Sequence, residues 1–200
     1  MTSPPIRFFY DYVDPASYLL ELELQAAEKT AELIVERVPF ELRPPPQPMV
    51  DPESPKWIQH VEQAAGLASD LGVHVGAQMF VPWTRKAHEL VLHAGTHSLA
   101  QETHRAIYEG VFVEGLDIGR VDVLVTLGVR IGLDASKTKA VLDVDRYSDD
   151  IIRAREAALA AGITQVPCLV KGANRLEGFH NRHALSTFLH ASGTPDNTTD

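Results

Sequence analysis

The feature that most constrains this chain is a strand, a helix and a second strand close to its N-terminus. Residues Ile6 to Tyr12 are rich in β-branched and aromatic side chains, and Asp14-Pro15 ends them, because proline can open a helix but not continue a strand. Leucine and alanine then recur at helical spacing up to Ala31. A second extended run, Ile34 to Leu42, is closed by three prolines at 44–46. A connection of this length implies two parallel strands with a right-handed crossover, so the sequence predicts a βαβ unit.

The middle of the chain has an almost wholly helical pattern. Apolar residues recur at helical spacing, and glycines separate one segment from the next. The predicted helices span residues 57–71, 84–93, 98–113, 121–131 and 136–142. Because no convincing strand interrupts them, we expect residues 46–143 to form a helical insertion domain.

The C-terminal part of the chain is predicted to close as helix, hairpin, helix. The expected elements are a helix over 146–161, short strands at 168–170 and 175–177, and a last helix over 181–191. We expect residues 1–45 and 144–191 to form one discontinuous α/β domain of βαβ plus αββα order. Residues 192–200 are small and polar, which predicts a disordered tail.

The acidic composition limits the partners of this chain. The formal net charge is -9, so a phosphate backbone or an anionic membrane surface would be repelled. No basic start followed by an apolar run marks the N-terminus, and no apolar run elsewhere reaches membrane-spanning length. A single cysteine, Cys168, excludes an intrachain disulfide and fits a reducing compartment. We therefore expect a cytoplasmic protein that binds neither nucleic acid nor membrane.

Several segments resemble those of a known superfamily. Residues 8–19 (FFYDYVDPASYL) resemble the strand-to-helix turn of the DsbA superfamily, where a Cys-Pro-X-Cys or Ser-Pro-X-Ser motif opens the first helix. Residues 162–172 (GITQVPCLVKG) resemble its Val-Pro segment, whose cis proline lies against that turn. Residues 83–90 (WTRKAHEL) and 112–118 (FVEGLDI) are similar to insertion segments of one branch, which contains 2-hydroxychromene-2-carboxylate isomerases, kappa-class glutathione transferases and FrnE-type oxidoreductases. The resemblance implies a DsbA-like thioredoxin fold with a helical insertion, and a homodimer.

The turn at the start of the first helix has lost both cysteines, because it reads Asp-Pro-Ala-Ser at 14–17. A helix N-terminus favours an anion. In the glutathione-dependent relatives a serine hydroxyl donates to the bound thiolate, a role that the resemblance offers to Ser17. Asp14 either repels a thiolate or, if burial keeps it protonated, donates a hydrogen bond as well. Simpler alternatives are an ordinary N-cap for Asp14 and a first-turn serine that faces solvent for Ser17.

The resemblance also places a ligand at the Val-Pro segment. The backbone edge of Val166 beside Pro167 suits glutathione or another extended thiol peptide as an added strand. Residues 178–182 (GFHNR) resemble the segment that holds the γ-glutamyl end of glutathione in the kappa-like branch, with asparagine in place of an aspartate. The resemblance implies ligand contacts from His180, Asn181 and Arg182. Further candidates for the cleft are Tyr12, Trp83, Thr84 and His88. Packing at a helix–helix contact is an equal alternative for His88, and core packing is the simpler interpretation of Trp83.

Three functions remain open from the sequence. The first is a glutathione- or thiol-dependent isomerase or transferase that acts on a small apolar substrate, with Ser17 and Asp14 as catalytic residues. The second is a FrnE-like oxidoreductase that lacks the CxxC motif, whose redox chemistry would rest on Cys168, although a cysteine in an apolar strand is expected to be core packing. The third is a non-catalytic descendant that binds a peptide or small ligand. The histidine spacings predict no metal site.

Overall fold

The computed structural model of the protein describes residues 5–30, 33–73, 75, 76, 78, 80–180 and 182–190. In chain order its elements are β1 (Ile6–Tyr10), α1 (Pro15–Thr30), β2 (Val35–Pro39), α2 (Pro55–Asp70), α3 (Arg85–Gly95), α4 (Ala100–Phe112), α5 (Val121–Arg130), α6 (Ala135–Asp143), α7 (Ser148–Ala160), β3 (Cys168–Lys171), β4 (Asn174–Glu177) and α8 (Arg182–His190). Each predicted strand and helix is present, with shifted ends. The ends predicted at Ala31, Asn181 and Ala191, and the predicted tail 192–200, lie outside the described residues.

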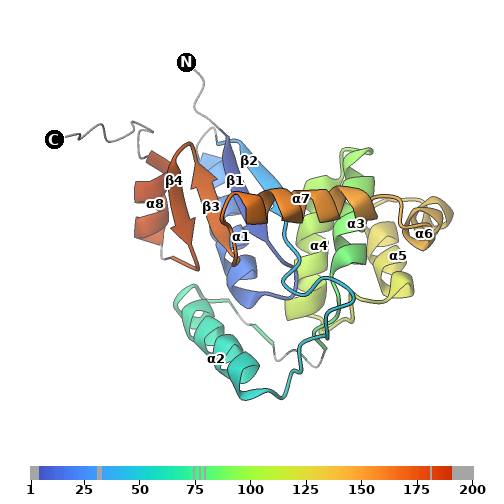
Figure 1. Ribbon diagram of the computed structural model, residues 1–200, viewed down its shortest axis with the longest axis horizontal. Coiled ribbons are helices and arrows are strands. Elements are labelled where there is room, and N and C mark those ends of the chain that lie inside the picture. The colour runs from blue at the N-terminus through green and yellow to red at the C-terminus, as the bar shows by residue number, and fades with distance from the viewer. Residues whose placement is uncertain are drawn as a thin grey trace.

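The four strands form one mixed sheet of order β2-β1-β3-β4 (Figure 1). Strand β1 pairs in parallel with β2, with Ile6 opposite Val35. It pairs antiparallel with β3, where Phe8 lies opposite Leu169, and β3 pairs antiparallel with β4. The order of βαβ followed by αββα is therefore confirmed, and the strands from the two ends of the chain lie side by side.

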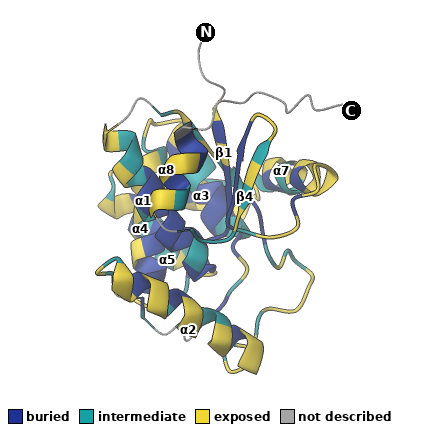
Figure 2. Cartoon of the chain, turned by 90° about the vertical axis from the view of Figure 1, so that its left-hand side faces the viewer, coloured by how far each residue is buried: buried dark blue, intermediate teal, exposed yellow. Residues whose placement is uncertain are grey.

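The two faces of the sheet are covered by different helices. Ile6, Phe8 and Tyr10 belong to the larger core cluster, which also holds the leucines of α1 and α8. Phe9 points to the opposite face and packs with Ala158 of α7, as alternation along a strand requires. Figure 2 shows α1 and α8 on one side of the strands and α7 on the other.

Strands β1 and β2 are both shorter than predicted, for one physical reason. The buried carboxylate of Asp11 accepts the backbone N–H of Tyr12 at 2.8 Å and that of Leu42 at 2.7 Å. These bonds satisfy donors that a longer strand would have paired in the ladder. The chain therefore leaves the sheet at Tyr10 and at Pro39, and Asp11 fixes the direction in which it enters the following turn.

Helix α7 starts later than predicted. Asp145 has a φ of 53°, and its carbonyl closes a turn by accepting the N–H of Ser148. A left-handed residue cannot lie inside a right-handed helix, so the helix begins only after this turn.

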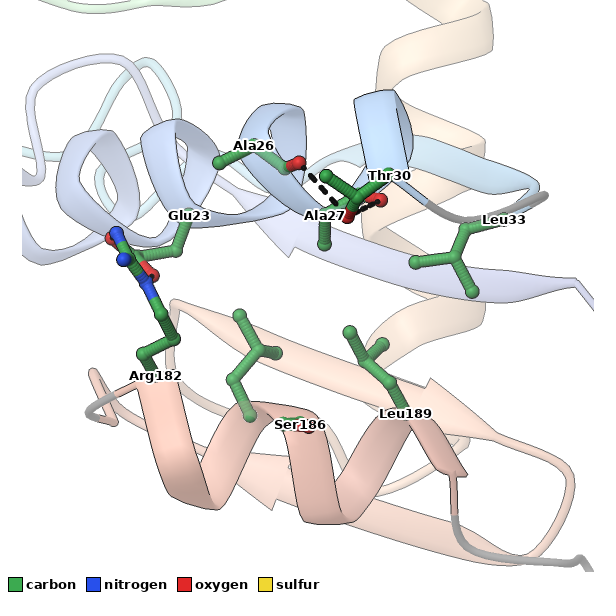
Figure 3. A pocket seen from close by; sticks show the side chains of 9 residues that line it. Glu23, Ala26, Ala27, Thr30, Leu33, Arg182, Ser186 and Leu189 are labelled. Atoms are coloured by element: carbon green, nitrogen blue, oxygen red, sulfur yellow. Dashed lines mark hydrogen bonds and ion pairs between the residues drawn. The ribbon is translucent and has the colours of Figure 1, made fainter.

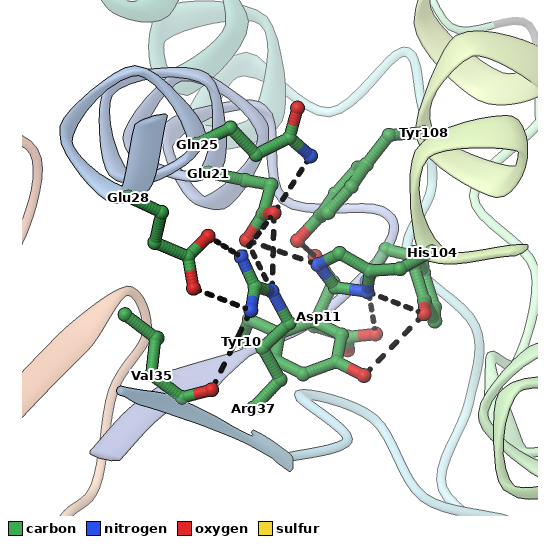
Figure 4. A network of polar contacts seen from close by, with 10 residues as sticks. Tyr10, Asp11, Glu21, Gln25, Glu28, Val35, Arg37, His104 and Tyr108 are labelled. Atoms are coloured by element: carbon green, nitrogen blue, oxygen red, sulfur yellow. Dashed lines mark hydrogen bonds and ion pairs between the residues drawn. The ribbon is translucent and has the colours of Figure 1, made fainter. Parts of the chain in front are cut away.

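A buried polar network joins α1, β2 and α4 (Figure 4). Arg37 donates to Glu21 at 2.8 Å and to Glu28 at 2.7 Å. The Nε2 atom of His104 lies 3.1 Å from Glu21, and its Nδ1 atom is 2.8 Å from the hydroxyl of Tyr12. Burial alone would raise the pKa of Glu21, but His104 and Arg37 outweigh it and lower that pKa to about 2.

Helix α2 is mostly exposed and packs against α1 (Figure 2). Its buried residues are Trp57, Ala64 and Ala68, which helical spacing places on one face. Among the described residues, no helix has the length and apolar character needed to cross a membrane.

Candidate active site at the N-terminus of helix α1

Asp14 occupies the position that the sequence assigns to a helix cap. Its Oδ2 atom accepts the backbone N–H of Ser17 at 2.7 Å, and its carbonyl accepts the N–H of Tyr18 at 3.2 Å. Pro15 follows as the first helical residue, where its missing N–H and fixed φ are tolerated best. The N-cap interpretation of Asp14 is confirmed, and the residue is only 1% exposed.

Ser17 does not face solvent, and its hydroxyl already has a partner. The side chain is wholly buried, and the hydroxyl donates to Asp14 Oδ2 at 2.5 Å. A hydroxyl carries one proton, so this geometry leaves no Ser17 donor for a bound thiolate. Both alternatives for Ser17 from the sequence, a solvent-facing serine and a thiolate donor, differ from the structure. Ser17 instead holds the Asp14 carboxylate in place.

The free oxygen of Asp14 binds a residue that the sequence did not single out. Nε2 of His60, on α2, lies 2.7 Å from Asp14 Oδ1. The hydrogen bond to Asp14 raises the pKa of His60 above its ordinary value, against a smaller opposing effect of burial. The His60 side chain is 37% exposed, so the ring is reachable from solvent while Asp14 behind it is not. An oriented imidazole of this kind can accept and return a proton near neutral pH.

The Asp14–His60 pair opens into a cavity of about 900 Å³. Its walls come from the α1 turn, the loop after β2, the start of α2 and the Val-Pro segment. The lining residues are Asp14, Leu42, Arg43, Pro48, Met49, Val50, Asp51, Ser54, Pro55, Lys56, Trp57, His60 and Val166. The Trp57 ring lies 5.3 Å from that of His60, and its buried indole N–H has no hydrogen-bond partner among the described residues.

The backbone of Val166 also borders this cavity. The Val166–Pro167 peptide bond is cis. The Pro167 carbonyl accepts the N–H of Gly178 at 2.8 Å, whereas the backbone of Val166 makes no such bond to the rest of the described chain. The structure thus brings together Asp14, Ser17 and Val166 from the predicted set, with an open N–H and C=O at Val166.

The other predicted cleft residues lie elsewhere. Tyr12 and His88 are wholly buried, and Nε2 of His88 lies 3.4 Å from the buried carboxylate of Asp11. Thr84 is 2% exposed, and its carbonyl accepts the N–H of His88 in the first turn of α3. The prediction that these three side chains line the cleft is therefore wrong. Trp83 is 38% exposed and lines a separate cavity between Pro45 and Arg120.

The residues predicted to hold the γ-glutamyl end of a ligand do not reach the Asp14 cavity. A contact of that kind would require His180 to face the cavity, but its Nε2 pairs with the carbonyl of Glu177 at 2.7 Å. Arg182 forms a bidentate pair with Glu23 on α1. Neither His180 nor Arg182 is among the residues that line the cavity. Asn181 lies outside the described residues.

Cys168 is a core residue. Its side chain is fully buried in the cluster on the α7 face of the sheet, and burial raises the pKa of the thiol to about 11. Reactive cysteines need thiolate character and exposure, and Cys168 has neither. No group of three His, Cys, Asp or Glu side chains converges on a possible metal position within the described part of the chain.

We therefore expect the native protein to leave Cys168 unmodified by a thiol-specific chromogenic reagent over a period in which free cysteine reacts completely. Denaturant should release one equivalent of reactive thiol, since the sequence has one cysteine. Replacement by serine should leave any enzymatic rate unchanged. Rapid labelling of the folded protein would contradict this assignment.

Comparisons with known proteins agree with this architecture. The family model described as the DSBA-like thioredoxin domain matches residues 5–190. A Bacillus subtilis protein, the uncharacterized YwbO, is 30% identical over 86% of this chain and 89% of its own length.

Similar solved structures carry several different activities in their names. A probable DsbA oxidoreductase from Streptomyces coelicolor is 21% identical, with a TM-score of 0.78 over 98% of this chain and 94% of that one. A 2-hydroxychromene-2-carboxylate isomerase is 15% identical, with a TM-score of 0.77 over 92% of each chain. The cytosolic disulfide reductase DsbM from Pseudomonas aeruginosa, solved with GSH, is 18% identical, with a TM-score of 0.67 over 94% and 100%. At these identities the likeness establishes the fold alone.

Proposed function

Because this chain belongs to the DSBA-like thioredoxin domain family, whose fold it shares with proteins named as oxidoreductases and isomerases, we propose that it is a thiol-dependent isomerase or transferase. Its cosubstrate is glutathione or a similar small thiol, and its second substrate is a small apolar electrophile. The observation that carries this proposal is the Asp14–His60 pair, placed where thiol oxidoreductases would have a cysteine.

The pair answers the objection that Asp14 would repel a thiolate. An ionised carboxylate at this position is balanced once His60 carries a proton, and the 2.7 Å contact favours that protonation. The site can therefore hold an anionic sulfur beside an imidazolium, as thiol enzymes do when a histidine lies next to their cysteine. The partial positive charge at the N-terminus of α1 also stabilises an anionic sulfur.

Asp14 and His60 have different roles in the proposed reaction. Asp14 accepts a hydrogen bond from the Nε2–H of His60, which leaves the other ring nitrogen, Nδ1, as the basic atom. His60 takes the proton of the thiol at Nδ1 and holds it, so that the charge created on the sulfur is matched by the imidazolium. When bound, the thiol supplies the sulfur nucleophile that forms a bond to an electrophilic carbon. Where the reaction leaves a carbanion, the proton at Nδ1 is in place to neutralise it.

The remaining wall of the cavity fits a small peptide thiol. The open backbone edge of Val166 can pair with an extended ligand, and the cations of Arg43 and Lys56 can bind its carboxylates. The apolar side chains of Met49 and Val50 complete the wall that would face the electrophile.

Glutathione binding is the first test of this proposal. A ligand at 100 times its dissociation constant stabilises the fold by about 2.7 kcal/mol, so millimolar glutathione should raise the melting temperature measurably. The bound thiol should show thiolate absorbance in the ultraviolet at neutral pH, and should react with chlorodinitrobenzene faster than free glutathione does. S-methylglutathione is the control, because it binds the same peptide contacts without a titratable sulfur.

Two outcomes would refute the proposal. If millimolar glutathione caused no shift in the melting temperature, glutathione would not be the cosubstrate. Binding without thiolate absorbance and without any acceleration would instead identify a non-catalytic ligand-binding descendant of the family.

A further inference from the structure

A second cavity lies between α1 and α8, away from the Asp14 site. It measures about 370 Å³, which falls in the range of small-molecule sites. Its lining residues are Glu23, Ala26, Ala27, Thr30, Leu33, Arg182, Leu185, Ser186 and Leu189. None of them lines the Asp14 cavity, so the two sites are separate.

The cavity exists because the two helices present side chains of unequal size. Figure 3 shows α1 and α8 running in the same direction, with Leu189 of α8 across the cavity from the small residue Ala27 of α1. Ala26 on α1 and Leu185 on α8 line the same space. The alanines leave a volume that larger side chains would fill. The walls are therefore apolar along most of their length, and the charged groups gather at the Glu23 end.

The ion pair at that end is asymmetric. Glu23 and Arg182 form a bidentate pair with distances of 2.8 and 2.9 Å. The side chain of Glu23 is only 6% exposed, whereas that of Arg182 is 76% exposed. Glu23 is thus a fixed carboxylate at the end of an apolar cavity, and Arg182 is a long surface side chain that can turn into water when another cation takes its place on Glu23.

We propose that this cavity binds a small amphipathic primary amine. The ammonium group replaces the Arg182 guanidinium on Glu23, and a short alkyl or aryl tail lies along Ala27, Leu185 and Leu189. Charge complementarity selects a cation: a buried carboxylate must be neutralised, and a second anion beside Glu23 would be repelled. The formal net charge of the chain, -9, also attracts a cationic ligand and repels an anionic one.

Calorimetric titration with three probes of equal length tests the head group. Hexylamine should bind, and hexanol and hexanoate should bind at least about tenfold more weakly, because each lacks the charge that Glu23 requires. Within the series from butylamine to hexylamine, affinity should rise about fourfold per methylene that the apolar walls cover.

Variants separate this site from a general apolar surface. Glu23→Gln should weaken hexylamine by at least about tenfold, whereas Glu109→Gln, which removes an acid from an exposed pair with Arg105, should change nothing. Arg182→Ala should strengthen hexylamine by about two- to fivefold, because the competing cation is gone. Circular dichroism checks that each variant is folded, and Ala27→Leu, which fills the cavity while keeping Glu23, should also abolish binding.

Three results would overturn the proposal. Equal binding of hexanol and hexylamine would mean an apolar surface without a head-group site. Preferential binding of hexanoate, lost in Arg182→Ala, would mean that Arg182 recognises an anion. Absence of binding by any of the amines would also overturn the proposal. If Ala27→Leu then converted a dimer to a monomer in sedimentation, the cavity would be occupied by a second copy of the chain.

Discussion

Replacing His60 with glutamine is expected to lower the rate of thiol conjugation by about two to four orders of magnitude, the range that a positioned acid–base group supplies. Glutamine retains a donor for Asp14 but cannot exchange a proton near neutral pH. Glutathione affinity should change little, since Val166, Arg43 and Lys56 remain. The measurement is kcat and KM for glutathione with chlorodinitrobenzene in excess.

The pH profile distinguishes a base from a merely structural residue. The contact with Asp14 raises the pKa of His60, so kcat/KM of the native protein should climb with pH through a midpoint above 6.5. The imidazole must be neutral to accept a proton, which gives the increase its sign. In His60→Gln this limb should disappear. The matched control is His97→Gln, a change at an exposed histidine outside the Asp14 cavity. An unchanged profile in His60→Gln would disprove the role of the ring.

Replacing Arg37 with methionine is expected to reduce the free energy of unfolding by about 3–5 kcal/mol, because it leaves the buried carboxylate of Glu21 without its cation. Glu21 is 1% exposed and also lies beside His104. That amount is a large fraction of the roughly 5–15 kcal/mol that holds a typical domain together. Urea unfolding at neutral pH measures it.

A surface pair supplies the control for this variant. Arg130→Met breaks an exposed pair with Glu114 and should change the free energy of unfolding by less than about 1 kcal/mol. Equal losses in the two variants would contradict the account of the network.

Acid titration provides an independent check on the same network. The pKa of Glu21 in the fold is about 2, below the ordinary 4.5, so its contribution to stability is present above pH 4.5 and is lost as the pH falls toward 2. In Arg37→Met, the loss of stability over that pH range should be smaller. A double variant, Arg37→Met with Glu21→Leu, should recover much of the stability, since an apolar pair of similar volume can replace a buried ion pair.

Local signals predicted the elements of this fold well, because they depend on neighbours in the sequence. Pro15 after Asp14 predicted the start of α1 where the structure has it, and the bond from the Ser17 N–H to the Asp14 carboxylate confirms the reason. The predicted strand lengths were wrong because Asp11 caps the backbone of Leu42, a residue far along the chain. A hydrogen bond between a side chain and a backbone N–H far along the chain produces no periodic pattern in the sequence.

The candidate site was predicted only in part for the same reason. His60 meets Asp14 through the packing of α2 against α1, which no spacing within α2 specifies. One signal was present: His60 follows Trp57 by one helical turn and shares its face, so it was placed to be half-buried. Arg182 was predicted to contact the γ-glutamyl end of a ligand, but its partner is the carboxylate of Glu23.

The position of β1 in the centre of the sheet has a consequence for synthesis on the ribosome. One edge of β1 is paired by β2, which follows soon after it, but the other waits for β3, translated after the whole helical segment. At about 5–20 residues per second, that wait is roughly ten to thirty seconds. Throughout it the nascent chain displays an unpaired strand edge carrying Phe8 and Phe9, the kind of surface that chaperones shield and that neighbouring chains on a polysome can pair with.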